Sequence, residues 1–343
     1  MKTAMGSAVP DLTEIHGDIV AAAGRLRGIA VRTPLLECPA ALTQGLGRVL
    51  IKAEILQRTG SFKFRGAYNF ISQLDSDTRS RGIVAFSSGN HAQAVAAVTQ
   101  MFDTLATIVM PADAPRLKIE ATRSYGAQIV LYDRHTESRE KIAQSLVCDL
   151  GAILVPPYDH LMTIAGQGTV GLEIVADLAQ RNLQPDMVLV PCSGGGLVAG
   201  IATAIKHSAP EAAIYAVEPE SYDDTTRSLQ SGRLEYNHGR TPSICDALLV
   251  QRPGDITFPI NRQLLAGGLV VTDAMARAAM VAAFRHLKIV VEPGGAVALA
   301  AVLNKLIDIS GKTIIVVCSG GNVDSGVFSD ALKVPGEALN ITG

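Results

Sequence analysis

Short apolar runs rich in Val and Ile alternate along the chain with longer segments whose apolar residues recur at helical spacing. Such short runs predict buried strands, and the longer segments predict helices. The predicted strands are residues 81–86, 105–110, 127–132, 187–192, 213–218 and 313–319, and the predicted helices include 91–102, 197–207, 273–287 and 296–306. This alternation predicts an α/β fold with a parallel sheet built from βαβ units.

Residues 221–262 interrupt this pattern. The region has little periodicity and contains Gly232, Gly239, Pro242, Pro253 and Gly254. Glycine and proline favour turns, so we expect the region to run over the surface.

Bulk composition narrows the class of protein. The chain has 343 residues, 48% of them hydrophobic, and 32 glycines, a texture typical of strands buried on both faces. Its net charge of −2 supplies no basic field for nucleic acid or a membrane surface. Five cysteines without a C-x-x-C pair indicate reduced thiols, and we see no apolar leader or membrane-length run. We therefore expect a cytoplasmic protein with no nucleic-acid or membrane partner.

Three loops combine glycine with small hydroxyl or amide side chains directly after a predicted strand. They are residues 87–91 (SSGNH), 193–197 (SGGGL) and 319–322 (SGGN). Ligands of open parallel sheets bind outside the carboxyl ends of the strands. We therefore expect these three loops to line one crevice.

Lys63 stands between two phenylalanines in the stretch GSFKFRG, residues 60–66. An ordinary lysine at a helix start is one interpretation. A lysine whose amine must lose its proton to react needs surroundings that disfavour the charge, and aromatic neighbours are compatible with that requirement. These seven residues alone leave both interpretations open.

The glycine run Gly194–Gly196 lies between a predicted strand and a predicted helix. Backbone amides there can approach an anion at the helix N-terminus, although a tight turn also needs glycine. Gly194, Gly196 and Ala199 also satisfy the dinucleotide pattern, with Glu218 as a ribose-binding acid, so an NAD-binding oxidoreductase is an alternative. A noncatalytic amino-acid or nucleotide sensor is a third hypothesis. Both alternatives leave Lys63 without a role.

Taken together, SFKFRGA, SSGNHAQA, SGGGL, EPGGA and CSGGN resemble the fold-type II family of pyridoxal-phosphate enzymes, and in particular its threonine/serine dehydratase–serine racemase branch. The resemblance runs from residue 31 to residue 324. It implies a tryptophan synthase β-like fold with a large cofactor-binding domain (1–81 and 160–343) and a smaller mobile domain (82–159) that closes over the substrate. It also implies a homodimer or homotetramer.

The resemblance implies that Lys63 forms a Schiff base with pyridoxal 5'-phosphate. The residues it places around that cofactor are Lys63, Phe62, Asn90, Ser193, Gly194, Gly195, Gly196, Leu197, Glu292 and Ser319. Ser319 falls where the family has a hydroxyl beside the ring nitrogen. A neutral hydroxyl gives a weaker electron sink than a carboxylate, which suits elimination of a β-substituent. For Glu292, a helix N-terminal charge is the alternative.

The same resemblance assigns the substrate to Ser87, Ser88, Gly89, Asn90, His91 and Arg139. The loop would bind the substrate carboxylate. Ser88 would act as the acid/base on the opposite face of the substrate, as serines do in the family's racemases, or would merely cap a helix. Arg139 is otherwise an ordinary solvated arginine of a helix.

The implied reaction is β-elimination from a β-hydroxy amino acid, with L-threonine or L-serine giving a 2-oxo acid and ammonia. The alternatives are a serine racemase or a dehydratase of 3-hydroxyaspartate, phenylserine or a hydroxyectoine-derived amino acid. Relatives often read A-D-G where this chain reads Cys245-Asp246-Ala247, which leaves the side-chain preference open.

Residues 218–224 resemble a divalent-cation loop of the racemase-like branch. Glu218 and Asp224 would supply carboxylates and Tyr222 a backbone carbonyl, which are oxygen ligands suited to Mg²⁺ or Ca²⁺. An acidic solvated turn is the alternative interpretation.

Overall fold

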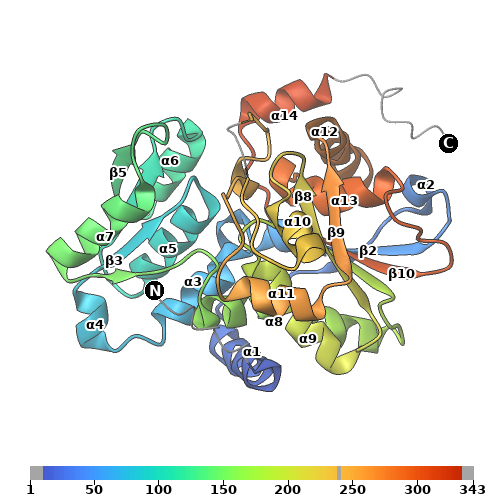
Figure 1. Ribbon diagram of the computed structural model, residues 1–343, viewed down its shortest axis with the longest axis horizontal. Helices are drawn as coiled ribbons and strands as arrows, with labels where there is room; N and C mark the ends of the chain where they lie inside the picture. The colour runs from blue at the N-terminus through green and yellow to red at the C-terminus, as the bar shows by residue number, and fades with distance from the viewer. Residues whose placement is uncertain (1–10, 238–240, 334–343) are drawn as a thin grey trace.

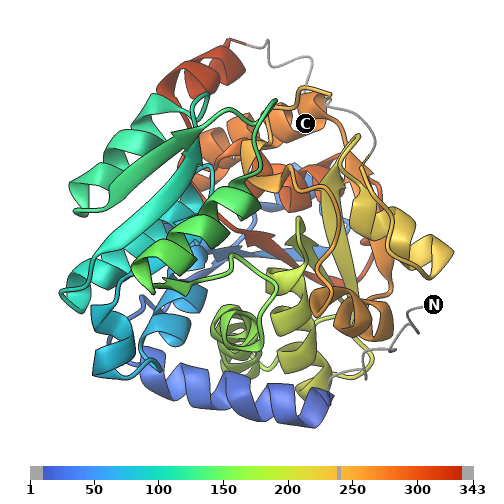
Figure 2. The ribbon, with the colours of Figure 1, turned by 60° about the vertical axis from the view of Figure 1, so that its left-hand side comes forward.

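The computed structural model describes residues 11–237 and 241–333, so the first ten residues and Gly239 lie outside the described parts. These parts contain two β-sheets, which Figures 1 and 2 show beside each other with helices packed around them. The larger sheet has the strand order β1 (Leu35–Glu37), β2 (Arg48–Ala53), β10 (Thr313–Cys318), β7 (Met187–Pro191), β8 (Ala213–Pro219), β9 (Gly267–Val271). The smaller sheet has the order β5 (Gln128–Tyr132), β4 (Ala106–Pro111), β3 (Ile83–Phe86), β6 (Ile153–Leu154).

All strand pairs are parallel except β1 with β2. The helices are α1 (Leu12–Leu26), α2 (Ala40–Thr43), α3 (Lys63–Ile71), α4 (Ser76–Ser80), α5 (Asn90–Met101), α6 (Arg116–Ser124), α7 (Arg139–Leu150), α8 (Leu161–Gln180), α9 (Gly196–Ser208), α10 (Asp224–Ser231), α11 (Thr257–Leu264), α12 (Asp273–Ala282), α13 (Pro293–Leu303) and α14 (Ser325–Leu332). Short 3₁₀ turns occupy Glu54–Leu56, Arg58–Gly60 and Asp246–Leu248, and a π-helical turn, Ala283–Leu287, extends α12.

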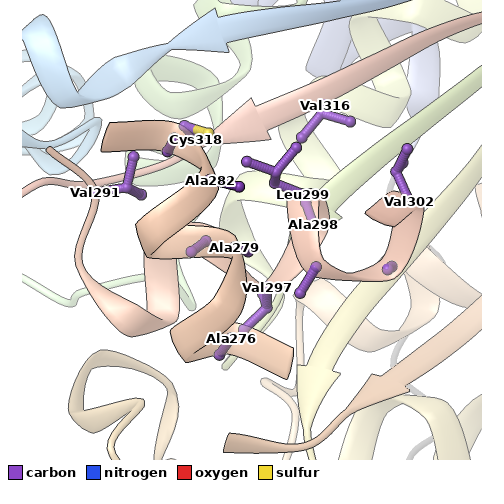
Figure 3. Close-up of a cluster of buried hydrophobic side chains, with 14 of the residues drawn as sticks. Ala276, Ala279, Ala282, Val291, Val297, Ala298, Leu299, Val302, Val316 and Cys318 are labelled. Atoms are coloured by element: carbon purple, nitrogen blue, oxygen red, sulfur yellow. The ribbon is translucent and has the colours of Figure 1, made fainter. Parts of the chain in front are cut away.

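The larger sheet is buried on both faces. Along β10, Ile314 and Val316 pack in the cluster that contains α12 and α13, shown in Figure 3, whereas Ile315 and Val317 pack against α8 and α9. Alternate residues of a strand point to opposite faces, so a strand covered on both sides reads as a continuous apolar run. This explains why the strands were visible in the sequence.

The smaller sheet draws its strands from residues 83–154 alone, inside the segment 82–159 expected to form the small domain. One face packs on α5 and α3, and the other on α7. Because α3 begins at Lys63 and also contacts α8, it joins the two sheets at the point where the site was expected. The division into domains that move relative to each other stays a prediction.

The six predicted strands and four predicted helices are confirmed, with shifts of up to two residues at most ends and a longer one at α13. The expectation for residues 221–262 was wrong in part, because α10 and α11 lie in it. The buried residues of α10 are polar, namely Asp224, Thr225, Thr226 and Ser228, so no apolar stripe marked the helix. Within the described ranges, no helix has the length and apolar character needed to cross a bilayer.

Candidate active site

The three glycine-containing loops meet at one pocket. The loop after β3 belongs to the smaller sheet, and the loops after β7 and β10 belong to neighbouring strands of the larger sheet. The predicted residues that line the pocket are Phe62, Lys63, Ser87, Ser88, Asn90, His91, Arg139, Ser193, Gly194, Gly195, Gly196, Leu197, Glu292 and Ser319. The expectation that the three loops line one crevice is therefore confirmed, although they come from two sheets and not from a single parallel sheet.

Lys63 is the first residue of α3 and projects its amine into this pocket. Its Nζ atom donates a hydrogen bond to the carbonyl oxygen of Pro157 at 2.7 Å and lies 5.0 Å from the centre of the Phe62 ring. Burial lowers the pKa of Lys63 to about 7, because a low-dielectric site disfavours the ammonium form. Phe64 points into the core between α3 and the smaller sheet, so Phe62 is the aromatic neighbour of the amine. With this pKa, about half of the Lys63 side chains carry a free amine at pH 7, far more than an ordinary lysine would.

The Ser193–Leu197 loop is held against α11 by contacts that only glycine permits. Gly195 has a φ of 91°, and a Cβ atom there would lie 2.5 Å from Nδ2 of Asn261. The carbonyl of Gly194 accepts from Oγ1 of Thr257 at 2.6 Å, and that of Gly195 accepts from Asn261 at 3.2 Å. Because C=O and N–H of a trans peptide point in opposite directions, these bonds turn the following amides away from α11.

The same loop begins with a polar atom that has no partner. Oγ of Ser193 is buried and makes no hydrogen bond within the protein. Next to it lie the glycine backbone and the N-terminus of α9, which favours negative charge. An unpartnered hydroxyl beside a helix N-terminus fits a phosphate group. With the Lys63 amine, which loses its charge near pH 7, in the same pocket, the residues present fit pyridoxal 5'-phosphate.

Glu218 takes no part in this loop. Its two carboxylate oxygens accept from the backbone amides of Thr225 and Thr226, at 2.9 and 2.7 Å, and so cap α10. The side chain is fully buried and cannot reach a ribose. This geometry argues against the dinucleotide-binding alternative.

The Ser87–His91 loop leads from β3 into α5. Gly89 is the N-cap residue of α5, no side chain caps this end, and Oγ of Ser87 accepts from the Gly89 amide at 3.1 Å. Ser88 therefore does not cap the helix, and its hydroxyl donates only a long bond, 3.5 Å, to the carbonyl of Asp246. Its role in proton transfer stays a prediction.

His91 is buried in a neutral form. Its Nε2 atom lies 2.9 Å from the carbonyl oxygen of Val155, and a carbonyl only accepts, so the hydrogen is on Nε2. Burial, aided by the nearby Lys63, lowers the pKa of His91 to about 3. Its other nitrogen, Nδ1, has no partner and is an acceptor. A carboxylate bound at this loop would thus depend on backbone amides and hydroxyls.

Glu292 connects the loop to the larger sheet. It is the N-cap residue of α13, in agreement with the alternative of a helix N-terminal charge, but its side chain makes no capping hydrogen bond. One oxygen accepts from Nδ2 of Asn90, and the other accepts from Nζ of Lys118 at 3.2 Å. Asn90 also accepts from Asn322 at 2.8 Å, so its amide is held from both sides.

Arg139 is the first residue of α7 and lines the pocket. Its guanidinium lies 5.1 Å from the centre of the Phe86 ring and pairs with Glu140 at 2.8 Å. The side chain of Arg139 is 28% exposed, whereas that of Glu140 is 59% exposed. Arg139 is therefore not a freely solvated helical arginine, and its pairing with an exposed carboxylate is weak enough to exchange.

The two carboxylates of the predicted metal site, Glu218 and Asp224, are close enough to influence each other's pKa. Burial and the neighbouring Asp224 raise the pKa of Glu218 to about 8, and burial raises the pKa of Asp224 to about 7. One oxygen of Asp224 accepts from Asn237 at 2.6 Å, while the other has no partner. In the described ranges, no group of three or more His, Cys, Asp and Glu side chains is arranged to hold a metal ion. A site at Glu218, Tyr222 and Asp224 stays a prediction.

The pocket contains residues that sequence reasoning did not assign to the site. They include Phe86, Tyr132, Arg134, Tyr158 and Asp246. Lys118 contacts the last of these, Asp246, through its ammonium group. A side chain on Gly194 would overlap the ring of Tyr158, so this tyrosine forms one wall of the glycine loop. Tyr132 ends β5 and Tyr158 lies shortly after β6, so the position of both near strand ends of the smaller sheet could have identified them. Lys118 lies in the charged segment RLKIE, which carries no such signal.

Comparison with known proteins covers almost the whole chain. A family model described as pyridoxal-phosphate dependent enzyme matches residues 26–320. An L-threo-3-hydroxyaspartate ammonia-lyase of Pseudomonas sp is 42% identical over 323 residues, which are 94% of this chain and 99% of that protein. An L-threonine ammonia-lyase of Thermotoga maritima is 41% identical over 307 residues, which are 90% of this chain and 75% of that protein.

Solved structures agree. A serine racemase of maize superposes with a TM-score of 0.86 at 36% identity, covering 95% of this chain and 97% of that one. The processed form of a threonine deaminase of Solanum lycopersicum superposes with a TM-score of 0.86 at 33% identity, covering 96% of this chain and 95% of that one. The predicted fold class is confirmed by these matches.

Proposed function

Because the chain belongs to the pyridoxal-phosphate dependent enzyme family, we propose that it removes water and ammonia from a β-hydroxy amino acid by β-elimination. The observation that carries the proposal is the Lys63 amine, whose pKa burial lowers to about 7, beside a loop suited to a phosphate. L-Threonine would give 2-oxobutanoate and L-serine would give pyruvate.

When bound, pyridoxal phosphate withdraws electrons from the substrate Cα and so makes its proton removable. Lys63 is the base that takes this proton on Nζ, as its lowered pKa permits. The Cβ–O bond then breaks and the β-hydroxyl takes up one proton and leaves as water, which balances the proton that Lys63 took from Cα. The unsaturated amine that remains takes up water and yields a 2-oxo acid and ammonia. Ser319, a neutral hydroxyl 6% exposed at the end of β10, supports elimination over a long-lived carbanion.

The substrate carboxylate binds at the Ser87–His91 loop. Backbone amides at the N-terminus of α5 and the Ser87 hydroxyl supply the donors, since the neutral His91 presents an acceptor. This loop belongs to the smaller sheet and Lys63 to the element joining the sheets. Closure of residues 82–159 over the substrate would bring the loop against it and exclude water.

Arg139 would allow the pocket to bind a substrate with a second carboxylate on its side chain. Its guanidinium lines the pocket, and its present partner, Glu140, is largely exposed. Arginine recognises carboxylates through paired hydrogen bonds. We therefore propose L-threo-3-hydroxyaspartate as the preferred substrate, with L-threonine and L-serine as weaker ones. The 3-hydroxyaspartate relatives at 42% identity support this choice.

The test compares kcat/KM for these three amino acids in the wild type and in Arg139→Gln. A charged hydrogen bond contributes about 1.5–3 kcal/mol, so R139Q should lose roughly 10- to 100-fold on 3-hydroxyaspartate and less than about threefold on threonine. Arg139→Lys should recover part of the loss. Arg116→Gln, which alters a surface ion pair on α6, is the matched control. Equal losses on all substrates would contradict the role of Arg139.

A further inference from the structure

Lys118 makes a buried charged link between the two sheets. It lies on α6, next to the smaller sheet, and its side chain is 3% exposed. Its Nζ atom lies 2.7 Å from Oδ2 of Asp246 and 3.2 Å from Oε2 of Glu292. Asp246 begins a 3₁₀ turn and Glu292 precedes α13, so both carboxylates belong to elements that pack on the larger sheet.

Glu292 and Asp246 also contact the loop at residues 87–91, the first through its carboxylate and the second through its backbone carbonyl. The second oxygen of Glu292 accepts from the side chain of Asn90, and the backbone carbonyl of Asp246 accepts from Ser88 at 3.5 Å. The methylene chain of Lys118 lies against the same loop, because a Cβ atom on Gly89 would overlap its Cδ atom. The methylene groups of Lys118 therefore contact the loop directly, and its ammonium group is linked to the loop through Glu292 and Asp246.

Removing the ammonium would leave the two carboxylates uncompensated. Burial opposes the charge on Lys118, but Glu292 and Asp246 together hold its pKa above the ordinary value. Burial raises the pKa of Glu292, and the charge of Lys118 acts in the opposite direction. A buried charge that loses its partner is strongly destabilising, so Glu292 and Asp246 would separate or take up protons. Separation would move the acceptors of both Asn90 and Ser88, and protonation of Glu292 would weaken its bond to Asn90.

We propose that Lys118 is a positioning residue of the active site, which holds the Ser87–His91 loop against Asp246 and Glu292. The role rests on the proposed function in so far as that function makes the loop the binding site of the substrate carboxylate. Lys118 itself does not react. Its contribution is to keep the loop in place before the substrate arrives.

The experiment uses the holoenzyme and the variants Lys118→Met, Asp246→Asn and the double variant. Amide hydrogen exchange is measured in peptides that cover residues 87–91 and 244–249, and kcat and KM are measured in parallel. We expect exchange in K118M to rise at least tenfold in both segments, and KM to rise at least tenfold with a smaller change in kcat. Because the two residues act as a pair, the double variant should be no worse than K118M.

Lys52→Met is the matched control. Lys52 is also a fully buried lysine, paired with Glu173 at 2.6 Å, but it lies on β2 outside the pocket lining. Its loss should lower stability without raising exchange in either segment. The proposal is overturned if folded K118M shows unchanged exchange at residues 87–91, or if K52M changes both segments equally.

The two proposals fail in different ways. Exchange needs no turnover, so a holoenzyme inactive on every β-hydroxy amino acid contradicts the proposed function while the exchange result still decides the role of Lys118. If K118M does not fold, D246N decides by the same criterion, since it removes one of the two partners and keeps the lysine with Glu292. Unchanged exchange in D246N would then overturn the proposal.

Discussion

Nζ of Lys63 donates to the carbonyl oxygen of Pro157 at 2.7 Å, which ties the first residue of α3 to the segment that follows β6. Nε2 of Gln167 donates to the same carbonyl at 3.2 Å. The amine is thus held in place by a neutral acceptor, and no carboxylate of residues 11–237 or 241–333 forms an ion pair with it. The position of the Lys63 amine and its lowered pKa therefore have the same cause, namely burial beside a neutral hydrogen-bond acceptor.

This arrangement predicts the pH dependence of cofactor capture. Because the pKa of Lys63 is lowered to about 7, the reactive free amine grows as pH rises through 7 and is nearly complete above pH 8. The rate at which the apoprotein forms a borohydride-reducible adduct with pyridoxal phosphate should rise about tenfold per pH unit below 7 and level off above 8. An ordinary lysine, with a pKa of about 10.4, would keep rising through pH 9. Lys63→Ala should form no adduct at that position.

The glycine loop predicts a loss of cofactor affinity on adding one methyl group. Gly195→Ala places a Cβ atom close to Asn261 at a positive φ, so we expect a loss of about 1–3 kcal/mol in stability and at least a tenfold weaker pyridoxal-phosphate affinity. Titration of the apoprotein measures the affinity. Gly232→Ala is the control, since that residue also has a positive φ, of 74°, but its nearest neighbour would be 3.8 Å away. Equal affinities of the two variants would contradict the phosphate assignment.

Substitution of Ser88 should affect racemisation and β-elimination differently. Its hydroxyl does not cap α5 and makes only a 3.5 Å bond to Asp246, so it is available for proton transfer. Ser88→Ala should reduce formation of D-serine from L-serine by about 100-fold or more, a typical effect of losing an acid/base group, and should keep elimination within about tenfold. Chiral chromatography and keto-acid assays report the two rates. A parallel loss of both would show that Ser88 only binds substrate.

Glu218 and Asp224 predict a stability that falls with rising pH. Both pKa values are raised in the folded protein, to about 8 and about 7, so the native state holds more protons than the unfolded state from about pH 4 upward. Stability from this pair is therefore lost as pH rises from about 4 to about 8. Asp224→Asn removes one carboxylate, and its unfolding free energy relative to wild type should increase from pH 5.5 to pH 8. Asp330→Asn, an exposed control, should show no such trend.

The same pair offers a test of the predicted metal site. Mg²⁺ or Ca²⁺ binding would need both carboxylates charged, so it should raise the melting temperature of the wild type most at pH 8 and leave D224N unchanged. No shift with either ion at millimolar concentration would contradict the site.

Sequence alone predicted the parts of the site that rest on strong local patterns. Apolar runs located β3, β7 and β10, and the loops that follow them supplied Asn90, the Gly194–Gly196 turn and Ser319. The loops after β7 and β10 meet because these strands are parallel neighbours in the larger sheet, whereas the loop after β3 reaches the same pocket from the smaller sheet. The motif around Lys63 predicted that this lysine belongs to the site, and the structure shows that the pocket and Phe62 surround its amine while Phe64 packs elsewhere.

The features that the sequence did not predict depend on contacts between segments far apart in the chain. Lys118 has the local sequence of an exposed helix, and it is buried because Asp246 and Glu292 approach it from the larger sheet. Glu218 fitted both a ribose and a metal in sequence terms, but its oxygens cap α10. No local pattern reports which of several partners a carboxylate will find. The helix α10 was missed because its buried positions are polar, and α11 was missed because only Phe258 and Ile260 of its four buried positions are apolar.

The central claim is that the holoenzyme eliminates water and ammonia from β-hydroxy amino acids with Lys63 as its base. The most direct measurement is the release of 2-oxo acid and ammonia from L-threo-3-hydroxyaspartate, L-threonine and L-serine by the wild type and by Lys63→Ala. We predict equal amounts of the two products from the wild type, fastest with 3-hydroxyaspartate, and none above background from K63A. A wild type that carries pyridoxal phosphate on Lys63 yet releases neither product from any of the three would contradict the account.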